Sequence, residues 1–123
     1  MEEMIQKICT WLTTGKIDPA ILADNFMFSS PYWEGNNKAE FLAKFEDPTQ
    51  YINVSLSNII KFDPIIPFKS LDGKYFAIIM QYQSKNCTRV YETVFGKVND
   101  QGLLVELRSI YDLAATEKAH NIN

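Results

Sequence analysis

Residues 26–45 read FMFSSPYWEGNNKAEFLAKF, and this stretch decides the fold. Its first three apolar residues predict a short buried strand, and Ser29-Ser30-Pro31 turns the chain. Asn37 and Glu40 have the spacing of a helix-capping box, with Asn in place of Ser or Thr. We therefore expect a strand, a corner and then an amphipathic helix that ends at Asp47-Pro48.

Two further helices are predicted before this stretch. The first carries an apolar stripe at positions i, i+3, i+4 and i+7, made by Ile5, Ile8, Cys9 and Leu12. Gly15 ends it. Asp18 followed by Pro19 is an N-cap with proline at the first helical position, which predicts a short helix over Pro19–Asp24.

The second half of the chain alternates with a period of two, which is typical of half-buried strands. We expect four long antiparallel strands, over Tyr51–Phe62, Tyr75–Gln83, Arg89–Val98 and Leu103–Asp112. Pro64 and Pro67 break the first of them, and Gly73 and Gly102 mark turns. Residues 115–123 read as a frayed tail that leaves His120 exposed.

Helices first and long strands afterwards predict a single layered α+β domain. The 123 residues are 46% hydrophobic, which is enough for one core. The net charge of −3 offers no basic surface for nucleic acid or for an anionic membrane. The N-terminus MEEMIQKICTWLTTG lacks the basic start and unbroken apolar run of a signal peptide, so we expect a cytoplasmic protein.

FSSPYWEGNNKAEFLAKF, together with RSIYDL at the end of the last strand, resembles the nuclear transport factor two-like superfamily and its SnoaL-like and ketosteroid-isomerase-like members. The resemblance covers Glu2 to Leu113, giving one SnoaL-like domain over 1–114 and a tail over 115–123. It implies a cone-shaped α+β roll with a cystatin-like fold, in which three N-terminal helices pack in the concave side of a strongly curved, mostly antiparallel sheet. It also implies a deep apolar pocket and a homodimer through the outer sheet face.

The resemblance argues against steroid-isomerase chemistry. The carboxylate that moves the proton in those enzymes corresponds to Ser30 here, and the two oxyanion-stabilising positions fall on Ile8 and near Val94. A serine without a neighbouring base is not a general base, and an aliphatic side chain donates no hydrogen bond.

Two carboxylates are candidates for acid or base chemistry. Glu92 lies on a strand whose parity the sequence leaves open. An inward Glu92 would have a raised pKa, whereas cross-strand pairing with Arg89 or Arg108 at the surface is favoured on general grounds. Asp112 ends the last strand, where capping of nearby amides is favoured over catalysis.

The leading hypothesis is a pocket that binds a small hydrophobic or aromatic molecule. The predicted lining residues are Tyr32, Trp33, Phe45, Met80, Tyr82, Ser109 and Tyr111. The alternative is a cofactor-free SnoaL-like isomerase, cyclase, dehydratase or hydrolase that uses a pocket carboxylate and a tyrosine. No spacing suggests a metal site or a cofactor. An apolar outer face, with Tyr75, Ile79, Tyr91, Phe95 and Ile110, predicts a twofold homodimer.

Overall fold

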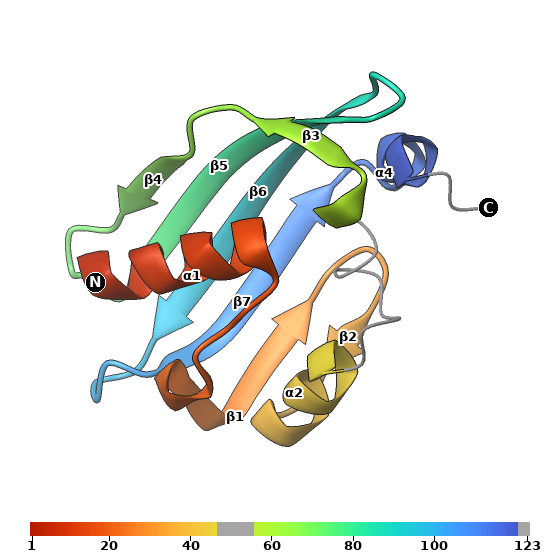
Figure 1. The fold of residues 1–123 in the computed structure, drawn as a ribbon. Helices are drawn as coiled ribbons and strands as arrows, with labels where there is room; N and C mark the ends of the chain where they lie inside the picture. The colour runs from red at the N-terminus through yellow and green to blue at the C-terminus, as the bar shows by residue number, and fades with distance from the viewer. Residues whose placement is uncertain (47–55, 121–123) are drawn as a thin grey trace.

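A curved sheet wraps around an N-terminal helix in the computed structural model, which describes residues 1–46 and 56–120 (Figure 1). The helical elements are α1 (Glu2–Thr14), the 3-10 turn η1 (Pro19–Ile21), α2 (Lys38–Glu46) and α4 (Leu113–His120). The strands are β1 (Leu22–Ser29), β2 (Glu34–Gly35), β3 (Ile59–Phe62), β4 (Ile66–Lys69), β5 (Tyr75–Ser84), β6 (Arg89–Val98) and β7 (Leu104–Tyr111).

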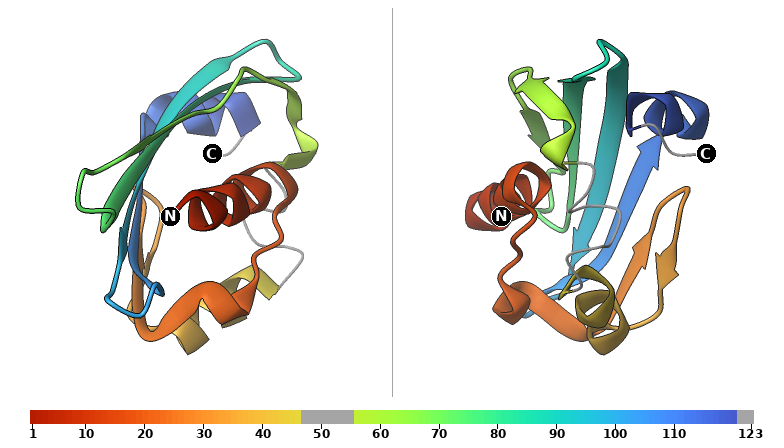
Figure 2. Two further views of the ribbon diagram at one scale, coloured as in Figure 1. Left: turned by 90° about the vertical axis from the view of Figure 1, so that its left-hand side faces the viewer. Right: turned by 45° about the vertical axis from the view of Figure 1, so that its right-hand side comes forward.

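The seven strands form one sheet in the order β2-β1-β7-β6-β5-β3, with β4 also paired to β5. All pairs are antiparallel except β1 with β7, which run parallel. The left view in Figure 2 shows the sheet bending around α1, with α2 below it. The predicted α+β class, with helices on the concave side of a strongly curved, mostly antiparallel sheet, is confirmed.

Helix α1 is amphipathic as predicted. Its buried residues are Met4, Ile5, Ile8, Trp11 and Leu12. Gly15 ends the helix in the left-handed region at φ 77°, and its N–H donates to the Trp11 carbonyl at 2.7 Å. Cys9 was predicted to be part of the buried stripe but is only half-buried, whereas Trp11 is buried.

The segment after Asp18 was predicted as a helix over Pro19–Asp24, and this is wrong beyond its first turn. Asp18 does accept a hydrogen bond from the Ala20 N–H, at 2.9 Å, so the N-cap is confirmed. The helical turn ends at Ile21, and Leu22 already begins β1, because Leu22, Phe26 and Phe28 all lie buried along the sheet.

The N-cap half of the capping box before α2 is confirmed, since Asn37 Oδ1 accepts from the Glu40 N–H at 2.9 Å. The predicted end of this helix at Asp47-Pro48 lies outside the described residues. So do residues 51–55 of the strand predicted over Tyr51–Phe62. The rest of that prediction is correct only for Ile59–Phe62, which form β3, because residues 56 and 57 are helical.

Pro64 and Pro67 were predicted to break the strand that runs toward Phe62. That strand, β3, does end at Phe62, but Pro67 itself lies within β4, opposite Ile78 of β5. Each residue of β4 is exposed. A proline without an N–H is tolerated at such an edge, where one side of the backbone faces no partner strand. The break therefore separates β3 from β4 without ending the sheet.

The β5–β6 hairpin has nine consecutive residue pairs, from Tyr75 opposite Lys97 to Gln83 opposite Arg89. The predicted inward stripe on β5 is confirmed, since Phe76, Ile78, Met80 and Tyr82 are all buried. A methyl group on Gly96 would lie 2.1 Å from the Phe76 ring. Glycine at this position lets the ring cross the backbone of β6.

The C-terminal segment was predicted as an exposed tail, and this is wrong for residues 115–120. Leu113–His120 form α4, which packs against β5 and β6. Thr116, Ala119 and His120 are its buried residues. No helix in the described ranges is long and apolar enough to cross a membrane.

Candidate functional site

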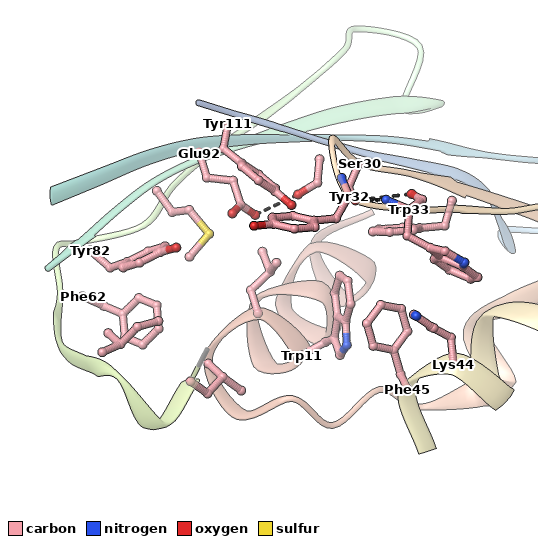
Figure 3. A pocket seen from close by; sticks show the side chains of 16 residues that line it. Trp11, Ser30, Tyr32, Trp33, Lys44, Phe45, Phe62, Tyr82, Glu92 and Tyr111 are labelled. Carbon is pink, nitrogen blue, oxygen red and sulfur yellow. Dashed lines mark hydrogen bonds between the residues drawn. The ribbon is translucent and has the colours of Figure 1, made fainter. Parts of the chain in front are cut away.

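A cavity of about 160 Å³ lies between the concave face of the sheet and the helices (Figure 3). The seven residues predicted to bind a ligand all line it. The remaining lining residues are Trp11, Leu12, Phe28, Ser30, Lys44, Leu56, Ile59, Phe62 and Glu92. The space enclosed by the fold is therefore hollow and largely apolar, with a few polar groups.

Glu92 points into this cavity from β6. The strand alternates so that Val90, Val94 and Gly96 are buried while Tyr91 and Phe95 are exposed, which settles the parity that the sequence left open. The favoured surface pairing of Glu92 is thus wrong. Arg89 instead lies 2.6 Å from Asp63, and Arg108 lies 3.1 Å from Glu106.

The Glu92 carboxylate has one neutral hydrogen-bond partner in the described part of the chain. The Ser109 hydroxyl donates to its Oε2 at 2.8 Å. Burial raises the pKa of Glu92 to about 7, and the Ser109 hydrogen bond offsets part of this rise. A carboxyl group with this pKa exchanges protons near neutral pH, which suits acid or base chemistry.

Tyr111 faces the same polar end of the cavity from β7. Burial raises the pKa of its phenol to about 12, against a smaller lowering by a hydrogen bond with Ser30. Its ring lies 6.4 Å from the ring of Tyr32. The phenol therefore stays protonated and can donate a hydrogen bond to a ligand oxygen or to Glu92.

Ser30 holds the corner that carries Tyr32 and Trp33. Its hydroxyl oxygen accepts from the backbone N–H groups of both residues, each at 3.2 Å. This is the role that short polar side chains take in turns. Ser30 thus organises the backbone of this corner.

Trp33 lies flat against the short strand that follows the corner. A methyl group on Gly35 would come within 2.6 Å of the Trp33 ring, so only glycine leaves room for the indole. The ring packs 5.9 Å from both Phe28 and Phe45. Trp33 belongs to the aromatic wall of the cavity through these contacts.

Trp11 is the centre of that wall, and it was not among the lining residues predicted from the sequence. Its indole lies 6.0 Å from Phe28, 5.7 Å from Phe41 and 5.7 Å from Phe45, with ring planes steeply inclined in each pair. Its position three residues after Ile8 places it on the buried stripe of α1, which was the available signal.

His120 was predicted to be exposed in the C-terminal tail, and this is wrong. It is 4% exposed, and its Nε2 lies 3.0 Å from the hydroxyl oxygen of Tyr82. Burial lowers the pKa of His120 and raises that of Tyr82, so the two neutral side chains share a hydrogen bond. The spacing of Thr116, Ala119 and His120 is the helical signal that could have revealed this contact.

Asp112 does not reach the cavity. It is exposed, and its Oδ1 accepts from the Ala115 N–H at 3.1 Å as the N-cap of α4. The capping role favoured for it is confirmed. Ile8 and Val94, at the family's oxyanion-stabilising positions, are fully buried core residues.

Within the described ranges, no three His, Cys, Asp or Glu side chains are grouped so that they could hold a metal ion. The polar groups of the cavity are thus one carboxyl, two serines, three tyrosines and one lysine. Such a set can bind a neutral molecule by hydrogen bonds and can move a proton.

Sequence comparison finds no matching family model and no matching curated protein. Structural similarity is extensive. A steroid delta-isomerase from Pseudomonas aeruginosa superposes with a TM-score of 0.67 at 15% identity, over 98% of this chain and 85% of that one. A SnoaL-like family protein from Agrobacterium tumefaciens gives 0.61 at 13% identity, over 91% and 99%.

An uncharacterized protein with a cystatin-like fold from Silicibacter pomeroyi gives a TM-score of 0.66 at 16% identity, over 98% of this chain and 84% of that one. At these identities the likeness concerns the fold. The chain therefore shares the fold of these three proteins, one of which is described as cystatin-like.

Proposed function

We propose that this protein binds a small hydrophobic or aromatic molecule in the cavity between the sheet and α1. The observation that carries the proposal is a hollow of about 160 Å³ walled by aromatic side chains. An apolar cavity of roughly 150 Å³ can hold a benzene molecule. The ligand is therefore the size of a single ring with a few substituents.

The polar groups at the sheet end would orient this ligand. Glu92, Ser109 and Tyr111 lie on β6 and β7, where backbone pairing of Glu92 with Tyr111 and of Val94 with Ser109 fixes their spacing. A few fixed hydrogen-bonding groups in an apolar pocket are typical of small-molecule sites. Ligand hydroxyl or carbonyl groups would face this end.

Binding can be tested with para-cresol as a single-ring probe, by calorimetry and thermal unfolding. At one hundred times its dissociation constant, a ligand adds about 2.7 kcal/mol to the free energy of unfolding. The variant Met80→Trp fills the cavity and should abolish binding, whereas Tyr91→Ala on the outer face should not change it. Absence of binding by a panel of single-ring compounds to the folded protein would contradict the proposal.

A second candidate function is cofactor-free proton transfer. Ser30 cannot supply the base, which argued against isomerase chemistry at that position, but the inward Glu92 offers a carboxyl group from another strand and favours it. In its ionised form Glu92 would take a proton from a carbon next to a ligand carbonyl, and the enolate oxygen would accept a hydrogen bond from Tyr111. The protonated Glu92 would then return the proton to a different carbon of the same molecule, which completes an isomerisation.

This chemistry is tested by conversion of a β,γ-unsaturated cyclohexenone to its conjugated isomer, followed by ultraviolet absorbance. We expect Glu92→Gln to remove the activity while the folded structure and para-cresol binding persist. A rate equal to that of buffer, or one unchanged by Glu92→Gln, would leave binding as the only function proposed.

We also propose that the outer face of the sheet pairs with a second copy of the chain. Tyr91 is 62% exposed, Tyr75 49%, Ile110 48% and Phe95 46%. Lys97 lies opposite Glu106 on the same face, so a twofold arrangement could pair unlike charges around the apolar centre. A stable monomer in sedimentation equilibrium at micromolar concentration would contradict this.

A further inference from the structure

The two ends of the cavity carry opposite charges. Among the described residues, Glu92 is the only carboxylate that lines it, and Lys44 is the only cationic side chain. Glu92 extends from the sheet, whereas Lys44 extends from α2. Figure 3 shows them on opposite sides of the cavity, with apolar side chains between them.

Lys44 is half-buried, and its Nζ lies 5.6 Å from the centre of the Trp33 ring. No carboxylate in the described part of the chain lies within ion-pair distance of it. Contact with an indole face orients a lysine ammonium without neutralising it. Lys44 is therefore held beside the cavity with its charge available to a ligand.

A second donor lies at the same end. The Trp11 side chain is 2% exposed, and its indole N–H has no hydrogen-bond partner among the described residues. Trp11 and Trp33 pack on Phe45 at 5.7 Å and 5.9 Å. Buried polar groups are usually paired, so this N–H still lacks an acceptor, but its nitrogen has no accessible surface on the cavity and a ligand would reach it only after a shift of the ring.

The α2 end therefore offers a cation, whereas the sheet end offers the Glu92 carboxyl and hydroxyl groups. We propose that the ligand is a small ring-containing carboxylic acid, with its carboxylate toward Lys44 and a hydroxyl or carbonyl group toward Glu92. This inference rests on the proposed binding function and adds the chemical class of the ligand and its orientation in the cavity. A neutral ring compound would fill the apolar middle but leave both ends unmatched.

The test compares para-hydroxybenzoate with its amide, para-hydroxybenzamide, by calorimetry at low salt on the intact protein. The two probes share size and hydroxyl group and differ in charge. We expect the acid to bind about tenfold more tightly, since a charge-assisted contact is roughly twice as strong as a neutral one. Benzoate, which lacks the hydroxyl group, should bind more weakly than para-hydroxybenzoate.

Variants assign the charge effect to one residue. Lys44→Met should remove the preference for the acid, and Lys44→Arg should keep most of it. Lys38→Met is the matched control, because Lys38 lies on the same helix but does not line the cavity. Circular dichroism checks that each variant is folded, and the comparison of probes on the unaltered protein does not depend on any variant.

Equal affinity for acid and amide, with para-cresol still bound, would overturn this inference and leave the proposed binding function standing. An acid preference that Lys38→Met removes and Lys44→Met does not would also overturn it. If neither acid, amide nor para-cresol binds, the binding function itself fails and this inference fails with it.

Discussion

The two ends of the cavity are built by different physical means. At the α2 end, Trp11, Phe28 and Phe45 make steep ring contacts at 5.7 to 6.0 Å, and packing holds them in place. At the sheet end, Glu92 and Ser109 are joined by a hydrogen bond of 2.8 Å on paired strands. The α2 end stabilises the fold by aromatic packing. The sheet end lowers stability, because it buries a titratable carboxyl group.

Among the substitutions that test this difference between the two ends, Trp11→Ala is expected to change the free energy of unfolding most. Loss of a fully buried indole should lower the free energy of unfolding by about 4 kcal/mol, because the cavity cannot collapse completely. Urea denaturation measures this, with Trp33→Ala as a control at the half-buried rim. Equal losses of unfolding free energy for the two variants would show that Trp11 contributes no more to stability than Trp33 does.

The next effect concerns pH and the sheet end. The folded protein holds the Glu92 proton more tightly than the unfolded chain, since burial raises its pKa from 4.5 to about 7. The contribution of Glu92 to the free energy of unfolding is fully present below pH 4.5 and is lost as the pH rises to about 7. The loss should amount to about 3 kcal/mol.

Glu92→Gln should remove that decline, whereas Glu106→Gln on the outer face should retain it. Denaturation at a series of pH values measures the difference between the variants. If the free energy of unfolding of Glu92→Gln depends on pH in the same way as that of the unaltered protein, the Glu92 carboxyl is exposed to water. The two ends of the cavity would then not differ as described.

A smaller effect is expected where α4 meets the sheet. Tyr82 and His120 share a buried hydrogen bond of 3.0 Å, which should give a coupling energy of about 1 kcal/mol in a double-mutant cycle. The cycle uses Tyr82→Phe, His120→Gln and their combination. Additive losses would mean that α4 is attached by packing alone.

The smallest effect is expected for Ser109→Ala. The Ser109 hydroxyl stabilises the ionised form of Glu92, so its removal should raise the pKa of Glu92 further. Carbon-13 resonance of the carboxyl group measures it, and Ser29→Ala is the control outside the cavity. A lowered pKa would reverse the role assigned to Ser109.

The sequence predicted the hairpin best, because alternation along β5 and β6 is a local property that burial on one face enforces. The ends of β6 at Arg89 and Val98 are as expected. The direction of Glu92 could not be predicted, since a strand with Tyr91 and Phe95 on one face and Val90 and Val94 on the other is apolar on both.

The C-terminal helix was missed for a related reason. The segment from Ala115 to His120 is polar, and its burial depends on contacts with β5 and β6 that are distant in sequence. The seven predicted lining residues do surround one cavity, since strand parity and the Ser30 corner place them. The contributions of Trp11 and Lys44 come from the packing of α1 and α2, which periodicity alone does not specify.

The most direct test of the central claim is a carbon-13 titration of the Glu92 carboxyl group, without ligand and with saturating para-cresol. The account predicts an apparent pKa of about 7 without ligand, because the group is desolvated at the end of a hollow. It also predicts that the bound ring changes this value. A pKa near 4.5 that para-cresol leaves unchanged would contradict both the buried carboxyl and the ligand cavity beside it.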